Sequence, residues 1–302
     1  MQNESGWYLG KAYTPWDAAT RAPAYTLPPG ACDCAVHVYD PSGQSRLDPR
    51  RKYDAPPFTG IDDMRRMHAI LGVQRAVLVQ PSIYGTDHRL LLQLLRAYPD
   101  AYRGVAIVDD SVSDAELAEL HAAGVRSARF NVLSSLGTPW SPHDFQRNLD
   151  RIRELDWIVS LPATVPELAA LADFVRRIRQ PVVLDHLAYF SASDVDSPGE
   201  RLIAELVAQG NWWLKISRTD QVSTQGPPYD DTVPLVQRLA RLDISRVLWA
   251  TDWPHVLYEG AMPNDGDLVD ILARHLPDAA QRRAVLVDNP AELFGFAPVP
   301  AA

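Results

Sequence analysis

The chain alternates between short apolar runs and segments of helical periodicity, and this strand-to-helix unit recurs eight times after residue 30. Short apolar runs bounded by turn residues are typical of buried parallel strands. We expect strands at 31–39, 75–81, 102–109, 125–132, 157–162, 181–187, 212–217 and 246–253. We expect helices at 61–71, 87–98, 114–123, 143–155, 166–178, 200–209, 231–242, 267–275 and 279–287. This order predicts an α/β fold, a (β/α)8 TIM barrel, and a doubly wound sheet is disfavoured because no glycine-rich loop follows the first strand.

The barrel pattern starts after an N-terminal arm, residues 1–30, which is rich in proline and aromatic residues and has no clean period. We therefore expect residues 31–302 to form a single barrel domain, and the chain length of 302 residues with 46% hydrophobic residues suits one large core. The arm fits either a wrap around the barrel or a contact with a second subunit. A homo-oligomer is one of the options.

The charge and hydrophobicity of the chain limit the kinds of partner that we expect, and its cysteine content bears on whether it contains a disulfide. The formal net charge is −9 and there is no basic stripe, so nucleic acid is not expected as a partner. No apolar run is long enough to cross a bilayer, and the N-terminus lacks a signal-peptide pattern, which predicts a cytoplasmic protein without a membrane partner. Cys32 and Cys34 lie two apart on one expected strand, where neighbours rarely form a disulfide, so we expect buried thiols.

Polar residues gather where the expected strands end, which is the end of a barrel that carries chemistry. A lone histidine in an apolar strand is more often a core residue, and an arginine near a strand end usually pairs with a carboxylate. Three candidates, His37, His186 and Asp252, come from three strands yet should meet at one mouth, and this convergence favours catalysis. Candidate substrate-binding residues are Arg126, Arg129, Arg218, Tyr53, Ser82, Tyr84 and His255. Three further histidines, His121, His143 and His275, on helices or at their starts, are predicted to face solvent.

At these residues the sequence resembles the amidohydrolase superfamily, and within it the "amidohydrolase 2" group. The segments that carry the resemblance are CDCAVHVYDP at 32–41, LDHL at 184–187, RVLWATDWPH at 246–255 and NPAELFGF at 289–296. Each motif is only moderately specific, but four in the right order on the expected elements are strong. The resemblance spans about residues 30 to 297.

Within that group the chain is similar to the 2-pyrone-4,6-dicarboxylate hydrolases and related lactonases. The similar segments are PGACD at 29–33, QPS at 80–82 with YGTD at 84–87, GVR at 124–126 with RFN at 129–131, and DWPH at 252–255. The resemblance implies opening of a small carboxylate-bearing lactone, such as 2-pyrone-4,6-dicarboxylate or a muconolactone, in aromatic-compound catabolism. It also implies that no metal cofactor is required.

One departure from the family pattern concerns metal binding. The family's first strand-1 histidine is replaced by Ala35, and a methyl group cannot ligate a metal, so we expect no cofactor. Ala35 is either a natural adaptation or a deliberate replacement of a histidine. Two rival functions stay open: a decarboxylase or amide hydrolase using one divalent metal such as zinc, and a catalytically dead barrel that binds a carboxylated ligand.

Lactone hydrolysis needs an activated water, a stabilised oxyanion and a grip on the substrate. We expect Asp252 to act as general base, and His37 and His186 to polarise the lactone carbonyl. Guanidinium groups match carboxylates, so arginines 126, 129 and 218 are the expected clamps for a small anionic substrate. Arg126 and Arg129 are an odd number of residues apart, so one of them is expected to face the helices. Tyr53, Ser82, Tyr84 and His255 could add further hydrogen bonds to the substrate.

Overall fold

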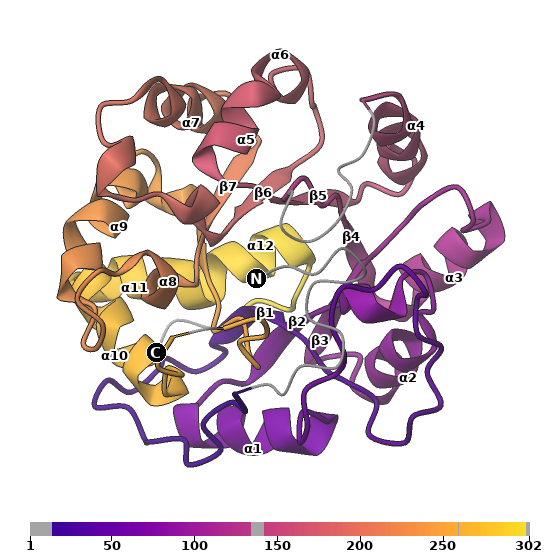
Figure 1. Cartoon of the computed structure of the whole chain (residues 1–302), viewed down its shortest axis with the longest axis horizontal. Helices are drawn as coiled ribbons and strands as arrows, with labels where there is room; N and C mark the ends of the chain where they lie inside the picture. Colours follow the sequence, from indigo (N-terminus) through magenta and orange to yellow (C-terminus); the bar gives the residue numbers. More distant parts are fainter. Residues whose placement is uncertain (1–13, 134–141, 259, 300–302) are drawn as a thin grey trace.

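Eight parallel strands follow one another around a ring in chain order, with helices on the outside (Figure 1). The computed structural model describes residues 14–133, 142–258 and 260–299. The strands are β1 Cys32–Val36, β2 Arg75–Val79, β3 Tyr102–Ala106, β4 Val125–Arg129, β5 Ile158–Pro162, β6 Val182–Asp185, β7 Trp212–Ile216 and β8 Val247–Trp249. The ring closes where the amide of His37 donates to the Trp253 carbonyl at 2.8 Å and that of Asp252 donates to the Ala35 carbonyl at 3.1 Å. The predicted (β/α)8 barrel is confirmed.

The helices largely match the periodicity of the sequence. They are α1 Ile61–Leu71, α2 Arg89–Ala97, α3 Asp114–Ala123, α4 Pro142–Arg153, α5 Val165–Ala170, α6 Ala172–Val175, α7 Pro198–Ala208, α8 Thr219–Val222, α9 Val233–Ala240, α10 Asp265–His275, α11 Ala279–Arg283 and α12 Asn289–Phe294. The Ser113 hydroxyl caps α3 by accepting from the Glu116 amide at 3.2 Å, and Gly124 ends that helix at φ 110°. The helix expected over 166–178 is instead divided into α5 and α6 at Leu171.

The barrel interior is a separate apolar cluster, distinct from the larger core between strands and helices. Its members come from all strands but β4, together with α12 and the residues that follow it, and include Cys32, Val77, Trp213 and Phe294. In Figure 1 α12 crosses the middle of the ring. The Arg103 guanidinium donates to the carbonyls of Phe294 and Gly295, which fixes this segment across the end of the barrel opposite the strand C-termini.

A register shift in β1 decides which side chains enter the barrel. The pairing with β2 slips between Asp33 and Val36. Ala35 therefore packs in the interior cluster with Cys32 and Cys34, while Val36 joins the outer core. Both sulfur atoms are buried and free, 3.8 Å apart, as predicted, and burial raises the pKa of Cys32.

The described part of the N-terminal arm lies against the barrel. The Trp16 indole donates to the Phe58 carbonyl at 2.8 Å, and its ring meets Trp253 edge-on at 5.2 Å. The Tyr25 amide donates to Asp270 at 3.1 Å. A wrap around the barrel therefore accounts for residues 14–30, whereas a role in oligomerisation stays a prediction. Among the described residues, no helix is both long and apolar enough to cross a membrane.

Candidate active site

The three predicted catalytic side chains meet at the C-terminal end of the barrel. His37 follows β1, His186 follows β6 and Asp252 follows β8. The Nε2 atoms of His37 and His186 lie 3.4 and 4.0 Å from Oδ1 of Asp252. Each of the three side chains is at most 9% exposed, so water screens their interactions little.

The orientation of His37 is fixed by the backbone of β2. Its Nδ1 lies 3.0 Å from the Val79 carbonyl oxygen, which can only accept, so Nδ1 carries a proton. In the neutral ring Nε2 is then an acceptor that faces Asp252. The side chains of His37 and Asp252 can therefore both accept hydrogen bonds from one water molecule.

His186 is held by the next strand. Its Nδ1 lies 2.8 Å from Oγ of Ser217, and burial lowers its pKa to about 4. The ring is therefore neutral at pH 7. When the Ser217 hydroxyl donates to Nδ1, the ring proton sits on Nε2, which makes Nε2 a hydrogen-bond donor at the site.

A buried ion pair lies directly beneath His186. Nζ of Lys215, 2% exposed, is 2.7 Å from Oδ1 of Asp185, and the Ser160 hydroxyl donates to Oδ2 at 2.6 Å. Burial alone would raise the pKa of Asp185, but Lys215, His186 and the Ser160 hydroxyl together outweigh it, and the pKa is lowered. Asp185, the residue before His186, is thereby bonded to the strands on both sides of β6, through Ser160 of β5 and Lys215 of β7.

Asp252 is held as a carboxylate by its neighbours. Nη1 of Arg218 donates to its Oδ2 at 2.9 Å. Burial pushes the pKa of Asp252 upward, yet His186, His37 and Arg218 together hold it well below the usual value of 3.8. Asp252 is consequently ionised at any working pH, and a substrate contact by the remaining donors of Arg218 stays a prediction.

Site residues share an unusual backbone conformation. His186, Arg218, Asp252 and His255 have φ of 56°, 55°, 63° and 59°. The turn His186–Tyr189 keeps positive φ throughout. A non-glycine residue in this region costs about 1–2 kcal/mol, and such costs cluster at functional sites. The strand ends are thus bent sharply to aim these side chains at one point.

Asp33 anchors the seam of the barrel. Its carboxylate accepts from the Thr251 amide at 3.1 Å and from the Thr251 hydroxyl at 2.5 Å. His68 of α1 lies 3.2 Å from the same carboxylate. This buried network fixes Thr251, the residue that precedes Asp252. Asp33 therefore supports the site by positioning Asp252 and is not itself a catalytic residue.

The two β4 arginines lie at opposite ends of the strand. Arg126 donates to the carbonyls of His121 and Val125, beside the end of α3 and away from His37. Arg129 ends β4, and its buried Nε has no hydrogen-bond partner among residues 14–133, 142–258 and 260–299. The structure therefore brings Arg129 to the site and does not bring Arg126 there.

Three predicted substrate contacts form a cluster beside His37. The Ser82 hydroxyl donates to the Tyr53 phenol at 3.3 Å, and Tyr53 lies 3.2 Å from the Tyr39 phenol. The Tyr84 phenol accepts from the Asp40 amide at 2.8 Å, and burial raises its pKa to about 12. Tyr84 thus stabilises the loop after β1, while a substrate contact by Tyr53 or Ser82 stays a prediction.

His255 forms a second buried pair next to Asp252. Its Nε2 lies 3.0 Å from Oδ1 of Asp265, and both side chains are fully buried. Burial would lower the pKa of His255, but Asp265 and Asp220 together outweigh it, and the pKa is raised. Among the described residues Nδ1 of His255 has no partner; because Nε2 donates to Asp265, Nδ1 accepts a hydrogen bond when the ring is neutral and donates one when it is protonated.

Two further residues at the site were not singled out from the sequence. Tyr189 stacks at a tilt 5.2 Å from His186, and burial raises its pKa to about 12. Asp220 lies two residues after Arg218 and is 5% exposed. Both sit one turn beyond a strand end, so a search extended a few residues past each strand would have found them.

The donor set does not fit a divalent metal. Ala35 occupies the position from which a second β1 imidazole would reach the site, and the Arg218 cation lies against the carboxylate of Asp252. No group of three or more His, Cys, Asp or Glu side chains in the described parts of the chain is arranged to hold a metal ion. The positive charge next to Asp252 comes from the protein itself.

Three further histidines, His121, His143 and His275, were predicted to face solvent, and for His275 this is wrong. His143 is 81% exposed, and His121 accepts from the Trp157 indole at 3.0 Å. His275 is 1% exposed, because α10 packs onto α9 and its Nε2 meets the Thr232 hydroxyl at 2.9 Å; burial lowers its pKa to about 3.

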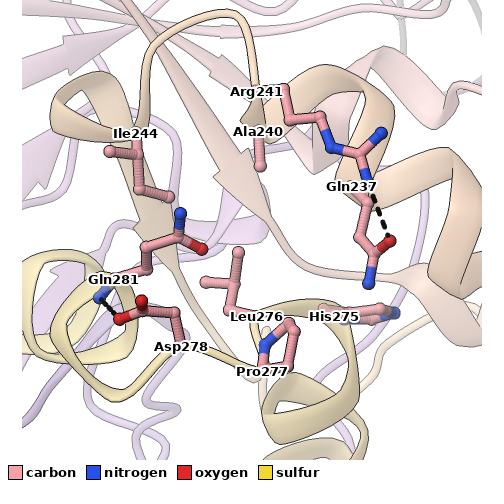
Figure 2. Close-up of a pocket in the computed structure, with 9 residues that line it drawn as sticks. All are labelled: Gln237, Ala240, Arg241, Ile244, His275, Leu276, Pro277, Asp278 and Gln281. Carbon is pink, nitrogen blue, oxygen red and sulfur yellow. Dashed lines mark hydrogen bonds between the residues drawn. The ribbon is translucent and has the colours of Figure 1, made fainter.

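A pocket beside His275 is separate from the catalytic residues (Figure 2). The volume of the pocket is about 420 Å³. It lies at the end of the barrel where β8 begins, opposite the end that carries Asp252. Its lining consists of Gln237, Ala240, Arg241, Ile244, His275, Leu276, Pro277, Asp278 and Gln281. None of the proposed catalytic residues borders it.

Comparison with known proteins identifies similar chains. The sequence model of a family described as amidohydrolase matches residues 32–296. A 2-pyrone-4,6-dicarboxylate hydrolase of Comamonas testosteroni is 35% identical over 290 residues, which covers 92% of this chain and 94% of that protein. A 4-sulfomuconolactone hydrolase of Rhizobium radiobacter is 32% identical over 276 residues, covering 90% and 92%. A ligand-free crystal structure from Agrobacterium tumefaciens superposes with a TM-score of 0.82 at 28% identity, covering 92% of this chain and all of that one.

Proposed function

Since this chain belongs to the amidohydrolase family, we propose that it is a hydrolase that opens a small lactone bearing an acidic group. Pyrone dicarboxylates and muconolactones are the lactone types we expect, in the breakdown of aromatic compounds. The relatives named above are hydrolases of such lactones, and they match this chain over nine-tenths of its length.

The observation that carries the proposal is the convergence of His37, His186 and Asp252 on one point. The three side chains lie at the ends of β1, β6 and β8 and within 4.0 Å of one carboxylate oxygen. They supply an acceptor, a donor and a base, which are the groups that ester hydrolysis needs.

In the first step water attacks the lactone carbonyl. Asp252 takes one proton from the water, and Nε2 of His37 accepts a hydrogen bond from the same molecule and orients it. The oxygen of the water forms a bond to the carbonyl carbon, whose π electrons move to the carbonyl oxygen. The neutral His186 donates from Nε2 to that oxyanion, which stabilises the tetrahedral intermediate.

In the second step the intermediate collapses. The electron pair returns from the oxyanion, the ring C–O bond breaks, and Asp252 gives its proton to the departing oxygen. The products are a carboxylic acid and a hydroxyl group on one open chain, so one water molecule is consumed and Asp252 is regenerated.

Arg129 is the proposed clamp for the acidic group of the substrate. Its guanidinium stands at the mouth with a buried Nε that lacks a partner among the described residues. A carboxylate or sulfonate oxygen there would satisfy that donor and neutralise the charge. Arg126 takes no part, because its donors serve backbone carbonyls elsewhere.

We further propose that this reaction requires no metal. The support is the donor set: Ala35 offers no ligand, and Arg218 supplies a cation at the carboxylate that a metal would need. The stabilisation of the oxyanion that a metal would supply is provided here by His186, and Arg218 keeps Asp252 ionised.

The test is ring opening followed by ultraviolet absorbance after treatment with a chelator. We expect turnover of at least one lactone from a panel that includes 2-pyrone-4,6-dicarboxylate and muconolactones. Asp252→Asn should fold and lose most activity, whereas Asp230→Asn, at an exposed aspartate, should retain it. Turnover that returns only with added zinc would instead support a metal-dependent hydrolase. Tight binding of carboxylated ligands with no turnover would support a binding protein.

A further inference from the structure

The backbone of Trp253 links two catalytic residues across the seam of the barrel. Its carbonyl oxygen accepts from the amide of His37 at 2.8 Å, and its own amide donates to the Thr251 hydroxyl at 3.1 Å. Asp252 lies directly before Trp253 in the chain. A displacement of the Trp253 backbone would therefore move His37 and Asp252 together.

The turn that carries Asp252 needs support from other parts of the chain. Asp252, His255 and Leu257 have φ of 63°, 59° and 60°, a left-handed conformation that residues other than glycine rarely adopt. Such a conformation persists only where the surrounding structure holds it in place. The groups that pack against this turn therefore determine where the Asp252 carboxylate lies.

The side chain of Trp253 packs on the N-terminal arm. Its ring is fully buried and meets the ring of Trp16 edge-on, with the ring centres 5.2 Å apart and the planes at 76°. The Trp16 ring is itself fixed, because its indole N–H donates to the Phe58 carbonyl at 2.8 Å. Trp16 is buried as well, so the contact is part of the core. Trp16 thus restricts where the Trp253 ring can lie.

A second contact connects the arm to the same turn. Nδ2 of Asn264, the N-cap residue of α10, donates to the Asp17 carboxylate at 2.7 Å. The next residue, Asp265, lies 3.0 Å from Nε2 of His255. The His255 amide in turn donates to the Asp252 carbonyl at 3.0 Å. The arm is therefore connected to the turn by two separate routes, of which the one through Trp16 is the shorter.

We propose that Trp16 is a positioning residue for catalysis, which acts on Asp252 through Trp253. The inference rests on the proposed role of Asp252 in lactone hydrolysis and gives the N-terminal arm a part in it. The Trp16 ring holds Trp253 at the seam, and the seam keeps the Asp252 carboxylate at its distances of 3.4 and 4.0 Å from His37 and His186. Without the ring the turn relaxes, and the base moves away from the water that it must deprotonate.

The first test is kinetic. Trp16→Ala removes the ring, and Trp16→Phe keeps an aromatic ring in its place. With a lactone that the native enzyme opens, we expect Trp16→Ala to lower kcat by about 10- to 100-fold and to change KM much less, because a misplacement of about 1 Å has an effect of this size. Trp16→Phe should retain most of the activity.

Tyr25→Ala is the matched control. Tyr25 is a partly buried aromatic residue of the same arm, and its contacts lie in α10 and α11, with Asp270 and Arg282. Its removal loosens the arm without touching Trp253. We expect Tyr25→Ala to lower stability and to keep the native kcat.

Hydrogen exchange reports on the seam without any substrate. The amides of His37 and Asp252 donate across the seam, and the amide of Val159 donates to the Pro181 carbonyl in another part of the barrel. We expect Trp16→Ala to speed exchange at the two seam amides by about 10- to 100-fold relative to Val159, a part of what removing a buried tryptophan costs. In Tyr25→Ala the seam amides should exchange no faster relative to Val159.

The outcomes separate this inference from the proposed function. A folded Trp16→Ala enzyme with the native kcat, an equal loss of kcat in Tyr25→Ala, or seam exchange unchanged relative to Val159 would overturn the role of Trp16 and leave lactone hydrolysis standing. If the native protein opens no lactone, the proposed function fails, and selectively faster seam exchange still supports Trp16 as the residue that holds Asp252. If Trp16→Ala does not fold, Trp16→Leu, which keeps apolar bulk without the ring, takes its place with the same expected results.

Discussion

Replacing Arg218 with glutamine removes one of the groups that hold the pKa of Asp252 down. Nη1 of Arg218 is 2.9 Å from Oδ2 of Asp252, and both side chains are less than 10% exposed. A hydrogen bond to a charged group contributes about 1.5–3 kcal/mol. At about 1.36 kcal/mol per pKa unit this corresponds to roughly 1–2 units. We therefore expect Arg218→Gln to raise the pKa of Asp252 by about 1–2 units.

The pH dependence of kcat reports this change. Only the ionised Asp252 accepts a proton from water, so activity falls as pH drops through its pKa. In the native enzyme that pKa is well below 3.8, and the acid limb lies at low pH. In Arg218→Gln the limb should move to higher pH by the same 1–2 units, roughly.

Arg218→Lys is the matched control, because it keeps the charge and changes the geometry. Its acid limb should stay near the native position even where KM rises. An Arg218→Gln enzyme with reduced kcat and an unmoved acid limb would refute the reasoning, since Arg218 would then position groups without controlling the ionisation of Asp252.

Two further predictions concern stability and are measured by urea unfolding. Lys215→Met leaves the buried Asp185 carboxylate without its cation and should lower the free energy of unfolding by about 3–5 kcal/mol. Adding Asp185→Asn should restore most of the loss. A loss under about 1 kcal/mol would show that the ion pair is not desolvated. Ala188 has φ 55°, so Ala188→Gly should leave stability unchanged or raise it. Ala204→Gly, in the interior of α7, should instead cost about 0.5–1 kcal/mol. Equal losses in both variants would contradict strain at Ala188.

The strand order could be read from the sequence because buried parallel strands and amphipathic helices have different periods. The residues at which the strands end could not be read from the sequence. The run expected over 181–187 continues through Leu187 because that residue is apolar, yet β6 stops at Asp185 and the chain turns left-handed. The hydrophobicity of a residue indicates whether it is buried, but not the sign of its φ. The turns that orient His186 and Arg218 therefore could not be predicted from the hydrophobic pattern of the sequence.

The same distinction applies to the site residues: their positions at strand ends could be predicted, but their surroundings in the folded chain could not. His37 and Asp252 were found because position at a strand end is visible in the sequence. The odd spacing of Arg126 and Arg129 predicted that one of them faces the helices, and that one is Arg126, the second residue of β4, which serves the end of α3. Asp220 was missed because it lies in α8, beyond the end of β7 and outside the strand-end positions that were considered.

The ionisation of Asp252 bears on which lactone the site suits. A carboxyl with a pKa held well below 3.8 is a weak base but, once protonated, a strong acid. Water attack is then assisted by the acceptor on His37, while return of the proton to the departing oxygen is strongly favoured. An enolate, the leaving group of a pyrone, departs readily and needs little help, whereas the alkoxide of a saturated lactone must be protonated as it leaves. The strong acid at Asp252 therefore favours saturated lactones.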